Sequence, residues 1–209
     1  MELVERDFEI LKWIHKFRFC LGRHIRVLAG FSGVRATNRR LKLLLEAGYL
    51  ERKKYMYGVP YLYTLTHKGR ILSGSNKRQD KIRIDRIMHD ISVLDTVVYY
   101  ASLYELGMAD IESEKELHIK DGFGSRKHYP DFVFTRDNQK IAVEIELTPK
   151  TKDRMEQNVR DNYMTFDTQI WITANHKVLS LLRIFSDAYA NIDVVRLEEV
   201  QADVQKRYS

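Results

Sequence analysis

The sequence has very little cysteine and no long apolar run. Cys20 is its single cysteine, and no cluster of cysteine and histidine has the spacing of a zinc site. A lone thiol forms no internal disulfide, so we expect a reducing cytoplasm, with Cys20 as a buried structural thiol in an apolar helical context. No apolar stretch approaches the ~18–20 residues that cross a membrane. The acidic, amphipathic opening MELVERDFEILKW also differs from a signal peptide, so we expect no membrane partner.

The remaining composition is that of an ordinary globular protein. Of 209 residues, 44% are hydrophobic and 31% are charged. A chain of this length forms one large domain or two small ones. The segment Ser73–Asp80 is short, polar and charged, and we expect the domain boundary there. The predicted domains are residues 1–75 and residues 81–209.

The net charge of +6 is unevenly distributed. Residues 1–80 contain 17 Lys and Arg against 7 Asp and Glu, whereas residues 81–209 contain 18 against 22. A basic first half beside a mildly acidic second half suggests that a polyanion binds the first half. The alternative is a basic surface that is only solvated.

The spacing of apolar residues in the first half predicts three helices followed by a β-hairpin. The third helix is expected to end at Gly48, which suits the position after a helix C-terminus. The predicted elements are helices over Asp7–Arg18 (with Asp7 as its cap), Gly22–Ala29 and Val34–Glu46, strands over Tyr49–Tyr57 and Tyr61–Leu65, and a helical turn from Thr66 to Arg70.

Basic and amide side chains gather on the third helix and on the hairpin. Arg and Asn can read base edges, whereas Thr and Lys more often hold phosphate. The candidate DNA-binding residues are Arg35, Thr37, Asn38, Arg39, Arg40 and Lys42 on the helix, and Arg52, Lys53 and Lys54 on the hairpin. For the hairpin tyrosines (49, 55, 57, 61 and 63) we expect packing more than base stacking. A protein-binding module with a solvated basic helix remains the alternative.

The pattern LLLEAGYLERKK…YGVPYLYTLTHKGRILS resembles the winged helix-turn-helix family over residues 5–73. The resemblance implies that the first half binds double-stranded DNA with its third helix in the major groove.

The second half mixes helices and strands, which predicts an α+β protein with a central mixed sheet. The predicted elements are a helix over Lys81–Leu106, a strand near Ile111–Ile119, a hairpin of Tyr129–Thr135 and Lys140–Leu147, a helix over Thr151–Met164, a strand over Thr168–Thr173, a helix over Val178–Tyr189 and a strand over Asp193–Leu197. The loop 120–128 is basic and is a further candidate for phosphate contact.

Carboxylates converge on the hairpin YPDFVFTRDNQKIAVEIELTPK. Glu144 and Glu146 lie on one face of an apolar strand, and Asp131 at the start of the partner strand can reach the same place. Such carboxylates are costly to bury unless they are paired or bound to a metal. Pairing with Lys150 or other nearby cations is one interpretation, and a Mg²⁺ site is the other.

The "PD" and "E-x-E" strands within this order of elements resemble the PD-(D/E)xK nuclease-like superfamily over residues 82–197. The resemblance implies metal-binding roles for Asp131 and Glu144. Glu146 stands where that family has lysine, so Lys150 is the candidate for a migrated lysine, and Asp90 or Asp95 for a further acid.

The whole arrangement is similar to the replication-relaxation family of plasmid and conjugative-element proteins, through His89-Asp90, Pro130-Asp131 and Glu144-Ile145-Glu146. This resemblance implies a setting in plasmid replication, DNA relaxation or mobilisation.

Two functions from different classes follow. The first is a sequence-specific DNA-binding protein of a mobile element, active in replication, mobilisation or transcriptional control. Its second domain would be non-catalytic and would serve homodimerisation or contacts with other replication or transfer proteins. The alternative is a Mg²⁺-dependent endonuclease with Asp131, Glu144, Glu146 and Lys150 as catalytic residues. An adaptor that binds only proteins is a third possibility.

Overall fold

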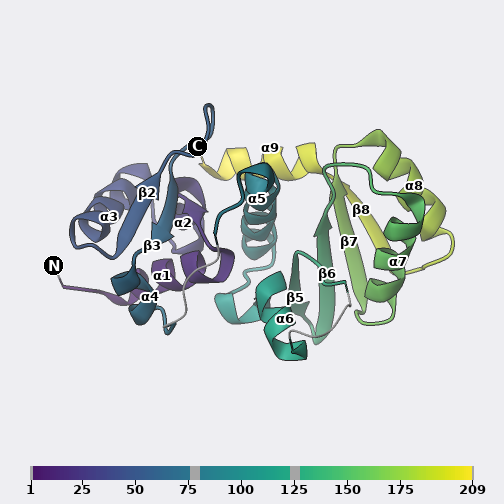
Figure 1. Ribbon diagram of the computed structural model, residues 1–209, viewed down its shortest axis with the longest axis horizontal. Coiled ribbons are helices and arrows are strands. Elements are labelled where there is room, and N and C mark those ends of the chain that lie inside the picture. The colour runs from purple at the N-terminus through teal and green to yellow at the C-terminus, as the bar shows by residue number, and fades with distance from the viewer. Residues whose placement is uncertain (1, 76–80, 123–127, 209) are drawn as a thin grey trace. The chain divides into compact units, whose positions relative to one another are not determined.

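The computed structural model describes residues 2–75, 81–122 and 128–208. The chain divides into two compact units, Met1–Val98 with Arg207–Ser209 and Tyr99–Lys206. The division falls inside one helix, α5 (Ile87–Leu103) (Figure 1). Most of the predicted linker, residues 76–80, lies outside the described residues, as do positions 123–127 of the predicted basic loop.

The first unit packs helices against a small antiparallel sheet (Figure 1). In its described part the strands have the order β1-β3-β2, with Leu50 opposite Leu65 in the β2–β3 pair. Ile10, Leu11 and Leu44 are fully buried in its core. Its elements are α1 (Glu5–Phe17), β1 (Cys20–Leu21), α2 (Gly22–Leu28), α3 (Val34–Glu46), β2 (Leu50–Lys53), β3 (Leu62–Leu65), α4 (His67–Leu72) and η1 (Ile84–Arg86).

The predicted third helix agrees with α3, which runs from Val34 to Glu46. Gly48 follows it with φ at +72°, a conformation that favours glycine over residues with a side chain. The hairpin strands are shorter than predicted. Strand β1 was not predicted, so the expectation of a helical context for Cys20 was wrong. Cys20 is nevertheless fully buried, and burial raises the pKa of its thiol.

The second unit is built around a mixed sheet, so the α+β class is confirmed. In its described part the strand order is β4-β5-β6-β7-β8; β4, β5 and β6 are antiparallel, and β6, β7 and β8 are parallel. Its further elements are η2 (Met108–Asp110), β4 (Ile111–Ser113), α6 (Glu114–Asp121), β5 (Phe132–Arg136), β6 (Gln139–Ile145), α7 (Lys152–Tyr163), β7 (Thr168–Thr173), α8 (His176–Ser186), β8 (Ile192–Arg196) and α9 (Leu197–Tyr208).

Both faces of this sheet are covered. On one face Trp171 of β7 is buried in a cluster with Met155 of α7 and Leu182 of α8. On the other face Phe134 of β5 stacks on Tyr100, with ring centroids 5.1 Å apart. Strand β6 lies in the middle of the sheet, so residues on both of its faces are removed from water.

Two α-helices in the described part of the second unit were not predicted. The expected strand 111–119 ends at Ser113, because Ser113 and Glu116 form a reciprocal cap that starts α6. Glu116 N donates to Ser113 Oγ at 3.4 Å, and Ser113 N donates to Glu116 Oε2 at 2.8 Å. Helix α9 at the end of the chain is the second. Among the described residues, no helix is both long and apolar enough to cross a membrane.

Candidate functional site

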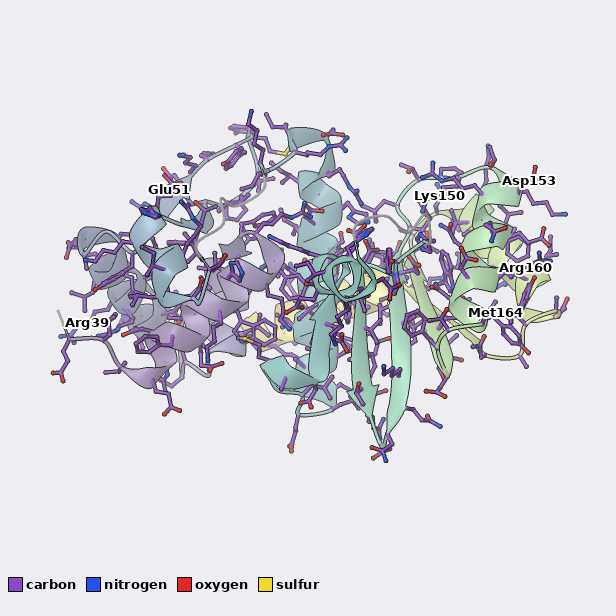
Figure 2. All side chains as sticks on the ribbon, turned by 60° about the horizontal axis from the view of Figure 1, so that its bottom comes forward. Arg39, Glu51, Lys150, Asp153, Arg160 and Met164 are labelled. Carbon is purple, nitrogen blue, oxygen red and sulfur yellow. The ribbon has the colours of Figure 1, made fainter. Side chains whose placement is uncertain are left out.

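Helix α3 presents one polar face to solvent. Arg35, Asn38, Arg39 and Lys42 are exposed there, whereas Leu41 and Leu44 on the opposite side are buried. Figure 2 shows Arg39 extending away from the ribbon into solvent. Lys42 Nζ lies 3.7 Å from Glu46 Oε1, one turn further along the helix. Four of the six residues predicted on this helix therefore form one accessible surface, which we call the α3 face.

The other two predicted residues of α3 hold the fold instead. Arg40 Nε donates to Asp7 Oδ1 at 2.6 Å, and the second terminal nitrogen of Arg40 donates to the other carboxylate oxygen. Asp7 is fully buried, and its Oδ2 also accepts from Val4 N at 2.8 Å. Thr37 is buried and donates from Oγ1 to Gly33 O at 2.9 Å. Asp7 is thus the third residue of α1 and the partner of α3, not the helix cap that the sequence suggested.

The end of β2 and the start of the loop that follows it carry exposed cations. Arg52, Lys53 and Lys54 are all exposed, and Lys53 Nζ lies 3.1 Å from Glu51 Oε2. We predicted that the hairpin tyrosines pack against the protein. This is confirmed for Tyr63, which is buried, but it is wrong for Tyr57, which is 96% exposed.

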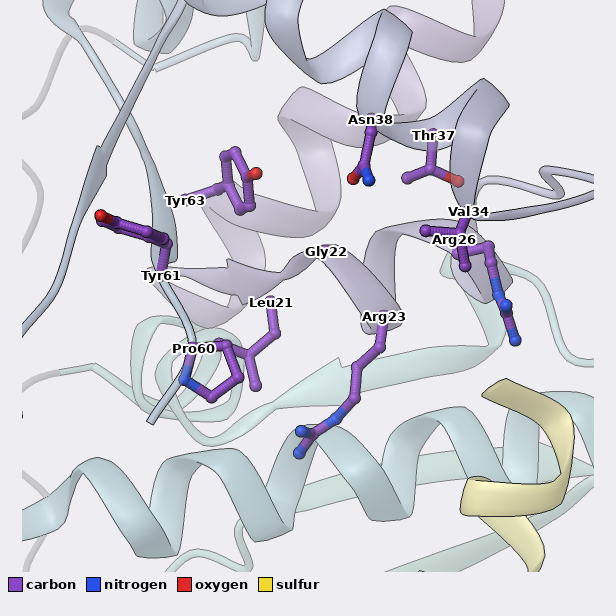
Figure 3. A pocket seen from close by; sticks show the side chains of 10 residues that line it. All are labelled: Leu21, Gly22, Arg23, Arg26, Val34, Thr37, Asn38, Pro60, Tyr61 and Tyr63. Carbon is purple, nitrogen blue, oxygen red and sulfur yellow. The ribbon is translucent and has the colours of Figure 1, made fainter. Parts of the chain in front are cut away.

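A cavity of about 270 Å³ lies beside the α3 face, between α2, α3 and the residues that lead into β3 (Figure 3). Asn38 lines it from α3, Arg23 from α2, and Tyr61 and Tyr63 from the hairpin. Asn38 therefore belongs both to the cavity wall and to the α3 face.

Acidic residues of α5 bind cations of the first unit. Arg23 donates to Asp95 from Nε at 3.1 Å and from a terminal nitrogen at 2.9 Å, and His24 Nε2 lies 3.0 Å from the same carboxylate. Arg18 lies 3.3 Å from Asp90. Asp90 and Asp95 are thus partners of cations near α2, and the suggestion that either supplies an acid to the carboxylate cluster finds no support in these contacts.

In the second unit, Glu144 of β6 is buried among hydrogen-bonding partners. It is paired in register with Trp171, so its side chain lies on the sheet face covered by α7 and α8. Its Oε1 accepts from Asn162 Nδ2 of α7 at 2.9 Å and also contacts His128 Nε2. The sequence showed neither partner, since both lie far from Glu144 along the chain.

The two other acids of the cluster are also engaged. Asp131 accepts at Oδ2 from Ile145 N at 2.8 Å, which ties the start of β5 to β6. Glu146 is 5% exposed and forms an ion pair with Lys150, which lies just before α7 (Figure 2). Pairing with Lys150 was one of the interpretations left open by the sequence.

The buried pair of Glu144 and His128 has shifted ionisation. Burial raises the pKa of Glu144, and the neighbouring Asp131 carboxylate adds to this, while His128 opposes it. Burial alone would lower the pKa of His128, but the Glu144 carboxylate outweighs this and raises it. Both shifts favour the proton-bound form of their group.

These carboxylates do not fit the predicted Mg²⁺ site. In the described parts of the chain, no three His, Cys, Asp or Glu side chains are grouped so that they could hold a metal ion. Glu144 is bonded to His128 and Asn162, and Glu146 is bonded to Lys150. Their negative charge is balanced by the protein itself.

A comparison with models of known protein families shows which family the chain belongs to. The family model described as Replication-relaxation matches residues 11–166, well over half of the sequence. The chain belongs to the replication-relaxation family. The match begins in α1 and ends after α7, so it includes both the α3 face and the carboxylates Asp131, Glu144 and Glu146. It confirms the resemblance drawn from the short motifs, and it suggests a role in replication or mobilisation of plasmids and other mobile elements. No curated protein matches the chain.

Proposed function

We propose that this member of the replication-relaxation family binds double-stranded DNA in a sequence-specific manner, as part of plasmid or mobile-element replication, mobilisation or transcriptional control. The first unit acts as a winged helix-turn-helix, with α3 in the major groove and the β2–β3 loop as the wing. Its element order supports this, since β1 precedes α2, and the hairpin follows α3 and pairs with β1 through β3.

The main observation behind this proposal is the α3 face. Its residues 35, 38, 39 and 42 follow the i, i+3, i+4, i+7 spacing of a single helical stripe. Arg suits guanine, and Asn suits adenine, through paired hydrogen bonds in the major groove. The first 80 residues also carry the excess of positive charge that a polyanion attracts.

The test is a binding assay on a selected duplex. Wild-type protein selects its target from a random duplex library, and anisotropy then measures affinity for that target. Arg35→Ala with Arg39→Ala should weaken binding by about 1–3 kcal/mol per residue. Arg160→Ala with Arg183→Ala removes two exposed arginines of the second unit and is the matched control. Equal affinity of the α3 variant and the wild type would refute the proposal.

For the second unit we propose a non-catalytic role in homodimerisation or in contacts with other replication or transfer proteins. Glu144 is hydrogen-bonded to Asn162, and Glu146 is paired with Lys150. This engagement of both carboxylates within the protein supports a non-catalytic role. Sedimentation at micromolar concentration measures the oligomeric state, and a monomer that stays monomeric on DNA argues against homodimerisation.

The alternative is a Mg²⁺-dependent endonuclease, and incubation with supercoiled plasmid and Mg²⁺ or Mn²⁺ tests it. We expect no nicking. Nicking that is lost in Asp131→Ala would replace the non-catalytic role with the endonuclease. Nicking that persists in Asp131→Ala indicates a contaminant.

A further inference from the structure

The tip of the β2–β3 loop displays apolar side chains to water. Tyr57 is 96% exposed and Met56 is 37% exposed, although both are large hydrophobic residues. Figure 1 shows this loop projecting beyond the helices of its unit. Tyrosine combines an apolar ring with a polar hydroxyl and is enriched at interfaces, so its exposure on a projecting loop suggests contact with a partner.

We propose that Tyr57, with Met56 beside it, enters the minor groove of the bound duplex and partly unstacks one base step. This inference rests on the proposed DNA binding, and adds that the protein distorts its target. With α3 in the major groove, a loop that extends beyond the unit can reach the neighbouring minor groove. Apolar wedges that enter there kink the duplex toward the major groove.

The loop is fixed at its base, which a wedge requires. Lys53 of β2 is paired with Leu62 of β3, and Leu62 is fully buried. Val59 returns into the core with 8% exposure. Gly58 has φ at +78°, which makes the sharp turn directly after Tyr57. The aromatic ring is therefore presented at the end of a short, anchored loop.

One cation lies beside the aromatic tip and another lies near the base of the loop. Lys54 Nζ lies 5.7 Å from the centroid of the Tyr57 ring, and Arg52 Cζ lies 4.9 Å from that of Tyr61. The minor groove is bordered by phosphates on both sides, so cations beside the wedge suit this groove. The combination of an exposed aromatic ring with flanking positive charge matches DNA better than an apolar protein surface.

The ease with which a DNA sequence deforms should then influence which duplexes the protein selects. Pyrimidine–purine steps such as TA and CA unstack most easily. We expect the selected duplexes to carry such a step at a fixed distance from the bases contacted by α3.

The experiment uses the full chain and the duplex selected by the wild type. Bending is measured by energy transfer between dyes at the duplex ends, and unstacking by fluorescence of 2-aminopurine placed along the site. We expect a bend and a local fluorescence increase with the wild type. Tyr57→Ala should abolish both and weaken binding about tenfold or more, since an aromatic that stacks on a base contributes strongly to affinity. Tyr57→Phe should retain both.

Lys53→Ala is the control for charge, since Lys53 is an exposed cation of β2 that pairs with Glu51. It should weaken binding while leaving the bend of the bound complex unchanged. If the wild type binds the duplex but Tyr57→Ala bends it equally, or if no bend forms, the wedge is overturned while DNA binding stands. If the wild type binds no duplex, both proposals fall.

Discussion

His24 Nε2 lies 3.0 Å from Asp95 Oδ1, while Leu21 N donates to His24 Nδ1 at 3.2 Å. The backbone donor requires an unprotonated Nδ1, so the proton of the neutral ring is on Nε2 and is donated to Asp95. His24 is fully buried. Protonation of Nδ1 would break the bond to Leu21, so this arrangement favours neutral histidine.

The first prediction concerns pH. Burial lowers the pKa of His24 below its usual 6.5, although Asp95 opposes this. Below about pH 6.5 the unfolded chain therefore binds a proton that the folded chain does not, and the free energy of unfolding falls as pH decreases. The slope is at most about 1.4 kcal/mol per pH unit from this group.

Urea unfolding between pH 5 and pH 8 measures this effect, with His24→Gln as the comparison. The pKa of His128 is raised, so His128 contributes stability at low pH that is lost as pH rises, the opposite sign. The difference between wild type and variant isolates His24. Parallel pH profiles for the two proteins would contradict the prediction.

Removal of Asp95 should destabilise the first unit strongly. Asp95→Ala leaves the Nε2–H donor of the buried, neutral His24 without its acceptor and the partly exposed Arg23 without its carboxylate, and a buried donor left unsatisfied costs about 1–3 kcal/mol. Asp85→Ala is the matched control. It removes an exposed ion pair with Arg83 and should change thermal unfolding little. Similar melting temperatures for the two variants would argue against a structural role for Asp95.

Arg40 and Arg39 are neighbours in the sequence, but their substitutions should differ in effect. Arg40→Ala leaves the fully buried Asp7 without its partner and should lower the free energy of unfolding by about 3 kcal/mol. Arg39→Ala should leave stability unchanged and weaken DNA binding. Denaturant unfolding and duplex affinity, measured on both variants, separate the two roles. Loss of affinity by a fully folded Arg40→Ala protein would instead place Arg40 at the interface.

The ion pair of Glu146 and Lys150 should be structural. Lys150→Ala leaves a carboxylate that is 5% exposed without a cation and should lower stability by about 2 kcal/mol. Lys152 is exposed two residues further on, so Lys152→Ala is the control and should have little effect. Chemical unfolding of both variants tests this, and an equal response would contradict it.

Local patterns predicted much of the fold. The apolar spacing and Gly48 located α3, and the alternation around Glu144 located the β-hairpin, whose Asp137 and Asn138 both have positive φ. The strand predicted near Ile111–Ile119 extends only from Ile111 to Ser113. The cap of Ser113 and Glu116 starts a helix there, and that signature is visible in the sequence.

The functional residues were harder to assign because their partners are distant along the chain. Arg40 lies 33 positions from Asp7, and Glu144 lies 16 positions from His128. The sequence predicts Arg39 and Arg40 on the same helix. Only the structure shows that Arg40 pairs with the buried Asp7, which leaves Arg39 as the one exposed to a ligand. The pairing of Glu146 with Lys150 could be predicted from the sequence, since the two residues are only four positions apart.

The single cysteine has a practical consequence for labelling. Cys20 is fully buried in β1, and its raised pKa keeps the reactive thiolate scarce. A maleimide dye should therefore leave the native chain almost unmodified. Ser180→Cys on the exposed side of α8 should then take up one dye per chain, without prior removal of Cys20.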